Sequence, residues 1–157
     1  MDIEKQDNTK RICNILFGPS DAPEVAYKDC GMFLYTLAKY FSWKSTYVYY
    51  KTRESDTTWN QEFSSYVNTI CIGETSDYKK QIELAKIFLK EHIHEFDVIM
   101  FFNYGSTVWK LSKYCKQLKP DIIVYSKLDM GIGGFEHFCG NKPFMWLRNY
   151  AEKLKSQ

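Results

Sequence analysis

Short, uniformly apolar runs alternate along this chain with longer stretches in which apolar residues recur every three or four positions. The runs at residues 11–18 and 97–102 are too short for helices, which is typical of buried strands. Residues 78–96 carry apolar side chains at helical spacing and predict an amphipathic helix. Strands without a polar face need cover on both sides. The pattern therefore predicts an α/β fold, a Rossmann-like doubly wound parallel sheet in three α/β/α layers.

The same reasoning predicts the order of elements. Strands are expected at residues 11–18, 45–50, 69–73, 97–102 and 121–125, helices at residues 30–41, 78–96, about 108–118 and 144–154, and a loop over residues 53–65. Asp29 precedes the first helix and is expected to cap it. Residues 1–10 are polar and charged and are expected to be disordered or loosely attached. Residues 11–157 show no repeat or linker and are expected to form one domain.

Charge is distributed unevenly along the chain. Of its 157 residues 45% are hydrophobic, which excludes general disorder, and the net charge is +2. Residues 1–109 carry 12 basic and 15 acidic side chains, whereas residues 110–157 carry 9 and 4. Much of the positive excess comes from Lys110, Lys113, Lys116 and Lys119. A solvated helix face explains these lysines, and attraction to phosphates or to an anionic membrane surface is the alternative. Nucleic acid is not expected as a partner, because no aromatic platform is interleaved with them.

Cysteine and histidine positions give no sign of a metal site. Five cysteines, an odd number, are widely spaced and never form a C-x-x-C pair, so neither a disulfide framework nor a zinc site is predicted. Cys13 and Cys71 are expected to be core thiols in strands. His92 and His94 are two positions apart on a helix and point to different faces, as surface residues. No apolar run approaches the roughly 20 residues that span a bilayer, and the start lacks a secretory signal, so we expect a cytoplasmic location.

Ligands bind parallel α/β sheets beyond the carboxyl ends of the strands, so a site is expected in the loops after residues 17, 102 and 125. The first loop carries neither the dinucleotide fingerprint nor the nucleotide phosphate loop. It ends in Asp29, Cys30 and Gly31 at a helix start, where a glycine lets an anion such as a diphosphate approach exposed N–H groups. Close packing of the helix on the sheet is the simpler explanation of this glycine.

The second loop offers an amide and a phenol. Asn103 and Tyr104 precede Gly105 after the fourth expected strand, and would suit a sugar or a phosphate. Ser106 or Thr107 also suits a helix cap, so the loop has a purely structural explanation as well.

The third loop pairs a cation with a carboxylate. Lys127 and Asp129 are two positions apart and lie on the same side of an extended chain, as a surface ion pair or as ligand contacts. Glu136 and His137 follow in a Gly-rich loop, which can present an acid/base pair, although nothing in the sequence fixes their geometry.

Four segments together resemble the amino-terminal domain of GT-B glycosyltransferases. They are FGP after the first strand, the Asp-Cys-Gly helix start, FNYGS after the fourth strand and KPDIIVYSKLDMG around the fifth. The likeness is to family 4-type retaining enzymes, and the KLD stretch is similar to a segment of bacterial members that build surface polysaccharides. The order of elements agrees over residues 11–154. The resemblance implies one half of a GT-B architecture, the acceptor-binding domain, with the donor domain absent.

The resemblance also implies partners and site residues. The substrates would be a nucleotide-sugar donor and a glycan or lipid-linked acceptor, with no metal and no further cofactor, in surface polysaccharide assembly at or near the inner face of the membrane. A hexosyltransferase of this kind needs both domains, so this domain alone is expected to be inactive. Gly31 matches the family glycine beside the donor diphosphate, with Asp29 next to it. The implied acceptor or cleft residues are Asn103, Tyr104, Gly105, Lys127, Asp129 and His137.

A second hypothesis needs no transferase chemistry. Gly31 and Lys127 would also fit the anion site of a stand-alone Rossmann-like or flavodoxin-like module. Such a module would bind an anionic small molecule or a protein partner.

Overall fold

The computed structural model describes residues 9–17, 26–27, 29–51, 59–102 and 106–127. The chain divides into two compact units, Met1–Lys127 and Leu128–Gln157, and every described residue belongs to the first. Its elements are β1 (Arg11–Ile15), α2 (Asp29–Phe41), β2 (Lys44–Lys51), α3 (Gln61–Tyr66), β3 (Val67–Glu74), α4 (Tyr78–His92), the 3-10 helix η1 (Ile93–Glu95), β4 (Val98–Phe102), α5 (Ser106–Leu118) and β5 (Ile123–Lys127). The predictions for residues 1–8 and 144–154 lie outside the described residues.

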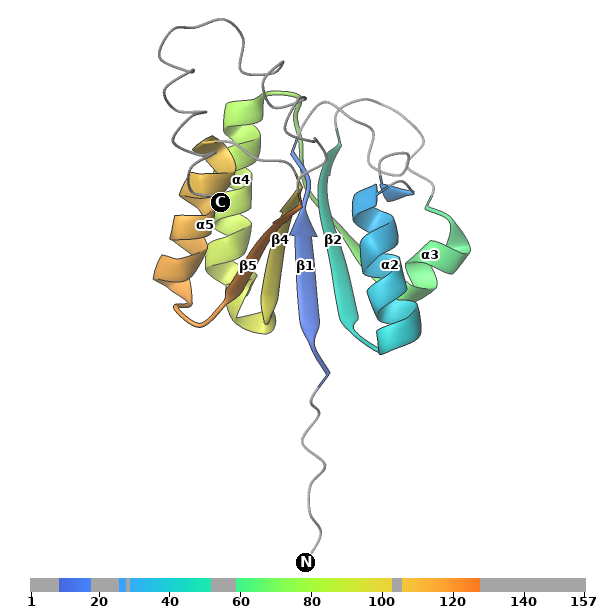
Figure 1. The fold of residues 1–157 in the computed structure, drawn as a ribbon. Coiled ribbons are helices and arrows are strands. Elements are labelled where there is room, and N and C mark those ends of the chain that lie inside the picture. Colours follow the sequence, from blue (N-terminus) through green and yellow to red (C-terminus); the bar gives the residue numbers. More distant parts are fainter. Residues whose placement is uncertain (1–8, 18–25, 28, 52–58, 103–105, 128–157) are drawn as a thin grey trace, which may run out of the picture. The chain divides into compact units, whose positions relative to one another are not determined.

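All five strands are parallel and are ordered β3-β2-β1-β4-β5 across the sheet (Figure 1). The central strand, β1, pairs with β2 on one side and β4 on the other, so that Asn14 lies between Tyr47 and Met100. This order is that of a Rossmann-like doubly wound sheet. The predicted α/β class with a parallel sheet is confirmed.

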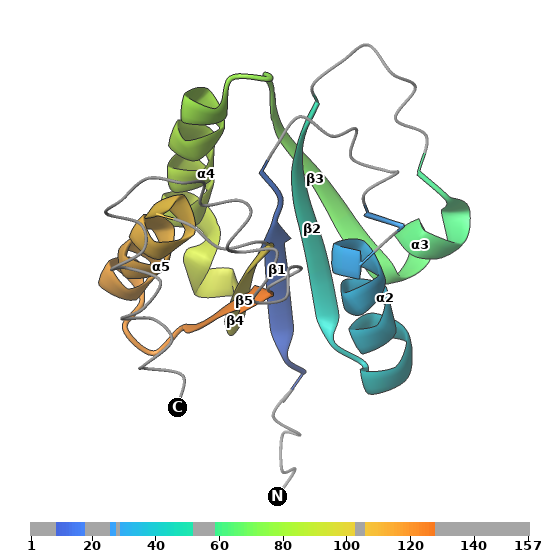
Figure 2. The same ribbon diagram turned by 45° about the horizontal axis from the view of Figure 1, so that its top comes forward.

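Helices cover both faces of the sheet, because successive side chains of each strand point to opposite sides. One core cluster joins Cys13, Ile15 and Phe101 to α4 and α5. The other joins Ile12 and Met100 to α2 and α3. Figure 2 shows the two pairs of helices on opposite sides of the strands. Burying an aliphatic or aromatic side chain contributes roughly 1.5–3 kcal/mol, so these two clusters are the main source of stability.

The loop predicted over residues 53–65 is partly wrong, because α3 begins at Gln61. The Asn60 side chain caps this short helix by accepting hydrogen bonds from the backbone N–H groups of Glu62 and Phe63, at 2.8 and 3.3 Å. Phe63 is the one buried residue of α3 and anchors it to the core. A helix of six residues with one apolar anchor has no periodicity to detect.

The last described strand begins two residues later than predicted. Ile122 donates its N–H to the carbonyl oxygen of Lys119 at 3.1 Å, which closes a turn, and the pairing with β4 begins at Ile123. As a result Lys127 is the final strand residue and pairs with Phe102, instead of lying in the loop beyond.

Two helix boundaries also differ from the prediction. Asp29 is the first residue of α2 and not the residue before it. α4 ends at His92, where a short 3-10 turn replaces the predicted last helical turn. Shifts of one or two residues at helix ends are ordinary, because the terminal backbone groups have alternative partners.

The predicted core position is confirmed for Cys13 but wrong for Cys71, which is exposed. Cys71 lies on β3, the outermost strand on its side of the sheet, where cover is incomplete. Burial raises the pKa of the Cys13 thiol well above its usual range and that of Cys115 to about 12, so both stay protonated. Among the described helices, none is both long enough and apolar enough to span a membrane.

Candidate functional site

The strand order creates a topological switch point between β1 and β4. The chain leaves β1 toward β2 and β3 on one side, then crosses back to β4 and β5 on the other. Loops on either side of such a point diverge, and they leave a crevice beyond the carboxyl ends of the two strands. The predicted site loops follow β1, β4 and β5, and the structure brings the carboxyl ends of these three strands to one edge.

The predicted site residues divide into two groups. Asp29 and Gly31 open α2, the first helix after β1, and Lys127 ends β5 beside Phe102. Their backbone positions therefore agree with a site at the carboxyl edge. The remaining candidates lie outside the described residues: Asn103, Tyr104, Gly105, Asp129 and His137.

Gly31 has a steric role that accounts for its identity. A Cβ atom at this position would lie 2.1 Å from the carbonyl oxygen of Ala26 and 2.7 Å from its Cα. Both atoms belong to backbone, which cannot rotate away as a side chain can. The close-packing explanation of Gly31 is thus supported, with the modification that the partner is the preceding turn and not the sheet. Access of an anion to the helix start stays a prediction.

Asn14 is a buried amide one residue before the end of β1. Its side chain is fully buried, and within the described part of the chain neither its nitrogen nor its oxygen has a hydrogen-bond partner. It shares the face of Ile12 and Leu16, which is the face that α2 covers. An unsatisfied buried amide costs about 1–3 kcal/mol, so a polar group that reached Asn14 beside the switch point would relieve that cost.

The sequence pattern did not single out Asn14. The available signal was one amide within the apolar run of residues 12–17. Such an amide predicts a buried polar position, but only the strand order places it at the switch point.

Two buried phenols lie beneath the edge on opposite faces. The hydroxyl of Tyr47 lies 3.8 Å from Sγ of Cys30, at the start of α2. Tyr50 donates a hydrogen bond to the carbonyl oxygen of Gln81 at 2.6 Å. Burial raises the pKa of both phenols far above the usual value, and the Cys30 thiol adds to the effect at Tyr47. Both phenols are therefore neutral, and they bring no charge to the site.

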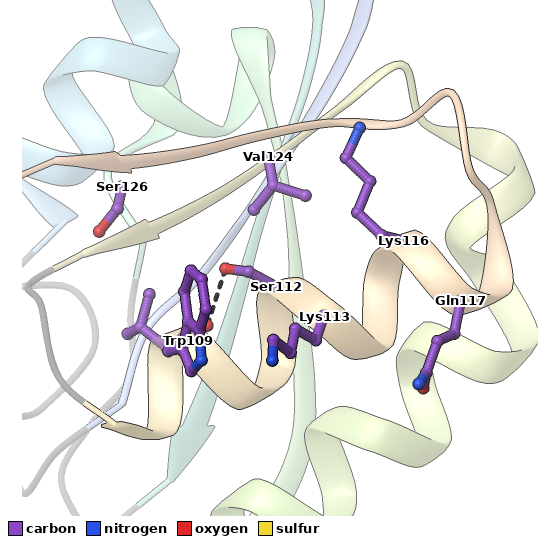
Figure 3. A pocket seen from close by; sticks show the side chains of 8 residues that line it. Trp109, Ser112, Lys113, Lys116, Gln117, Val124 and Ser126 are labelled. Atoms are coloured by element: carbon purple, nitrogen blue, oxygen red, sulfur yellow. Dashed lines mark hydrogen bonds between the residues drawn. The ribbon is translucent and has the colours of Figure 1, made fainter.

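A groove of about 610 Å³ runs between α5 and β5. Figure 3 shows Trp109 standing between the helix and the strand, near Val124 and Ser126. The groove is lined by Val108, Trp109, Ser112, Lys113, Lys116, Gln117, Val124 and Ser126. The lysines were noted in the sequence, whereas the tryptophan and the hydroxyls beside them were not. A second hollow, of about 380 Å³, includes Arg11 and Lys44 and lies at the opposite, amino-terminal edge of the strands.

The histidines are surface residues, as predicted. His92 is partly exposed and contacts Glu95 through Nδ1 at 2.7 Å, and His94 is exposed. Across residues 9–17, 26–27, 29–51, 59–102 and 106–127, no three His, Cys, Asp or Glu side chains come together as metal ligands would.

Comparison with known proteins leaves the chain without an assigned family. No protein-family model matches it, and no curated protein matches it.

Proposed function

We propose that this chain is the acceptor-binding amino-terminal domain of a GT-B glycosyltransferase. The enzyme would move a sugar from a nucleotide-sugar donor to a glycan or glycoconjugate acceptor. One observation carries the proposal: within KPDIIVYSKLD, the most distinctive segment of the family resemblance, residues 123–127 form β5, and Lys127 is the last residue of that strand at the carboxyl edge. That edge is where ligands bind in doubly wound sheets.

The described residues suit the binding part of such a reaction. The amino-terminal ends of α2 and α5 follow β1 and β4 and bring their positive dipole ends to the carboxyl edge. The last residue of the neighbouring strand β5 is Lys127, and we expect it to contribute a cation. Dipole ends and a cation stabilise the negative charge that develops on a departing diphosphate. The donor nucleotide would be held mostly by a second domain, so this domain alone should bind acceptor without transferring sugar.

The alternative is a stand-alone module that binds an anionic small molecule. The unsatisfied amide of Asn14 favours it, because an anion or its bound water at the switch point would supply the missing hydrogen bonds. In that case no sugar acceptor is required.

A nuclear magnetic resonance titration of the full chain separates the two functions. The titrants are a panel of neutral and acidic oligosaccharides, uridine diphosphate and pyrophosphate. We expect at least one oligosaccharide to shift the backbone amides of Phe17, Phe102 and Lys127, which border the carboxyl edge. Lys127→Ala should weaken that binding. Lys90→Ala, which removes the same charge from an exposed position on α4, should not.

Three outcomes are informative. Pyrophosphate shifts at these amides without any oligosaccharide shifts would favour the anion-binding module. Absence of shifts at the carboxyl edge with every titrant would contradict both functions. Oligosaccharide binding would be followed by a transferase assay on the natural reading frame that contains this chain, with nucleotide-sugar donors.

A further inference from the structure

We propose that the groove between α5 and β5 binds an anionic sugar chain, so that the acceptor of this domain is an acidic glycan. The choice of a sugar rests on the proposed function. The choice of a negative charge and the location do not, because they depend only on the side chains that line the groove.

The charge of α5 is of one sign. Residues 106–119 contain four lysines and no aspartate or glutamate. Lys110, Lys113 and Lys116 are exposed. A helix face with cations and no compensating carboxylate creates a positive potential, which attracts anions and excludes cations. Lys113 and Lys116 also line the groove. The ammonium group of Lys116 donates one hydrogen bond to the carbonyl oxygen of Pro120 at 3.2 Å and keeps further N–H groups for an occupant.

The remaining lining has the composition of a ligand site. Trp109 is 59% exposed although it lies beside apolar Val108 and Val124. The Ser112 hydroxyl donates a hydrogen bond to the carbonyl oxygen of Val108 at 2.7 Å. The Ser112 oxygen can therefore still accept a hydrogen bond from a ligand. Ligand sites combine an apolar lining with a few polar groups in volumes of roughly 300–1,000 Å³, and this groove falls in that range.

The exposed part of the Trp109 indole offers a flat apolar surface. The ammonium group of Lys113 lies 4.9 Å from the centre of its ring, in cation–π contact. A sugar ring presents C–H groups on one face and hydroxyl or carboxylate groups at its rim. Stacking on the indole would thus bring a sugar carboxylate close to Lys113, where a charge-assisted hydrogen bond forms.

Other anionic partners fit this lining less well. A peptide would gain most by pairing its main chain with β5, the last strand of the described sheet, and would not need the α5 side chains. A membrane surface suits projecting apolar side chains, whereas these residues line a recess. A chain of acidic sugars uses the hydroxyl, amide, indole and ammonium groups together.

The groove also leads toward the candidate site. Ser126, at one end of its lining, precedes Lys127 at the carboxyl edge, while Lys116 and Gln117 lie at the other end (Figure 3). An extended sugar chain in the groove would therefore run along α5 and β5 and place its end where the reaction is proposed.

The test is a titration of the full chain with hexagalacturonate. Binding is monitored by calorimetry and by the nuclear magnetic resonance signal of the Trp109 indole N–H. Maltohexaose has the same length without carboxylates. We expect hexagalacturonate to bind and to shift the Trp109 signal, and maltohexaose to bind at least about tenfold more weakly. Added salt should weaken the acidic sugar selectively, because exposed charges are screened.

Variants locate the binding. Trp109→Ala and the double variant Lys113→Ser/Lys116→Ser should each weaken hexagalacturonate binding by about tenfold or more. The matched control is Lys86→Ser/Lys90→Ser, which removes two exposed lysines from α4. All these positions are exposed, so the variants are expected to fold, which their amide spectra would verify.

Three results would overturn the inference, and a fourth would contradict only the proposed function. Equal weakening by the α4 control would show non-specific charge attraction. Tighter binding of hexaglutamate, or of vesicles containing phosphatidylglycerol, at the same residues would identify a peptide or membrane surface instead. A failure here with oligosaccharide shifts retained at Phe17 and Phe102 would leave the proposed function standing. Hexagalacturonate binding in the groove without shifts at Phe17 and Phe102 would keep the inferred groove site but contradict the proposed function.

Discussion

On the face of the sheet that α2 and α3 cover, side chains are buried beneath these helices but largely exposed on β5. Beneath these helices Tyr47 and Phe63 are almost wholly buried, whereas on β5 the side chains of Ile123 and Tyr125 are 59% and 48% exposed. The strand order explains the difference. Right-handed crossovers to β2 and β3 place α2 and α3 on this face, but after the chain reverses direction α4 and α5 fall on the other. Within the described part of the chain this face of β5 is only partly covered, by Phe33 of α2, whose ring stacks on that of Tyr125 with the ring centres 6.4 Å apart.

The same contrast holds for the polar groups of the two regions. On the covered side Lys39 of α2 contacts Glu62 of α3 at 2.9 Å and donates a hydrogen bond to the hydroxyl of Tyr35 at 2.6 Å. On α5 Lys113 contacts the ring of the exposed Trp109. Side chains that contact each other, such as Lys39 and Glu62, stabilise the fold. Exposed side chains such as Trp109 stay accessible to a ligand. From this comparison we expect ligand binding near β5 and the larger contribution to stability beneath α2 and α3.

The largest expected effect tests the covered region. Phe63→Ala should lower the free energy of unfolding by about 3–5 kcal/mol, because it empties a buried aromatic position between α2, α3 and the sheet. Tyr125→Ala, on the exposed face of β5, should cost no more than about 1 kcal/mol. Urea denaturation of both variants measures the difference. Equal losses would mean that the two sides of the sheet contribute alike.

A smaller effect is expected from a methyl group at the start of α2. Gly31→Ala should destabilise the fold by about 1–3 kcal/mol, because the new Cβ meets backbone of Ala26. Gly73→Ala is the matched control, since its Cβ would meet only the end of the Leu84 side chain, which can rotate. The comparison uses midpoints of thermal unfolding. A Gly31→Ala variant as stable as Gly73→Ala would remove the steric explanation and return Gly31 to the site.

Periodicity and composition were enough to predict most of the regular elements, whereas the location of the site stays a prediction. β4 and α4 were expected because one is a continuous apolar run and the other repeats apolar residues at helical spacing. The carboxyl edge was expected to hold the site, because ligands of doubly wound sheets bind beyond the carboxyl ends of the strands. The backbone positions of Gly31 and Lys127 agree with that expectation.

The rest depends on tertiary contacts that no local pattern encodes. α3 was missed because its stability comes from Phe63 and the cap by Asn60, two residues in a polar stretch. The groove was missed because Trp109 and Val124 come together only when α5 packs on β5. The exposure of Cys71 depends on β3 being an outermost strand, which the order of strands in the chain does not reveal.

Asn14 offers a third test, with a change of opposite sign. Asn14→Leu should raise the free energy of unfolding by about 1 kcal/mol, because an apolar side chain of similar size replaces an unsatisfied buried amide. Asn68→Leu, at an exposed position on β3, should have little effect. A loss of stability in Asn14→Leu would show that the amide is already hydrogen-bonded in solution. A gain in stability with weaker ligand shifts at the carboxyl edge would show that the amide is retained for binding.

The smallest expected effect concerns the ion pair that joins α2 to α3. The hydroxyl of Tyr35 donates a hydrogen bond to Oε1 of Glu62 at 2.5 Å, and Lys39 contacts the same oxygen. These two contacts, the tyrosine first, lower the pKa of Glu62 below its usual value of 4.5. A lowered carboxyl pKa in the folded state stabilises the fold above about pH 4.5, and this contribution is lost as the pH falls through the folded-state pKa.

Glu62→Gln should therefore make the unfolding free energy less dependent on pH in the acidic range, with only a slight loss near neutral pH, because the pair is exposed to solvent. Urea titrations at a series of pH values between neutral and acidic would measure the slope, with Glu83→Gln, an exposed carboxylate on α4, as the control. An unchanged slope in Glu62→Gln would mean that solvent screens the contact between α2 and α3 completely. In that case the aromatic and aliphatic core alone stabilises the covered side of the sheet. The polar contacts between α2 and α3 would then add as little to stability as the exposed lysines of α5.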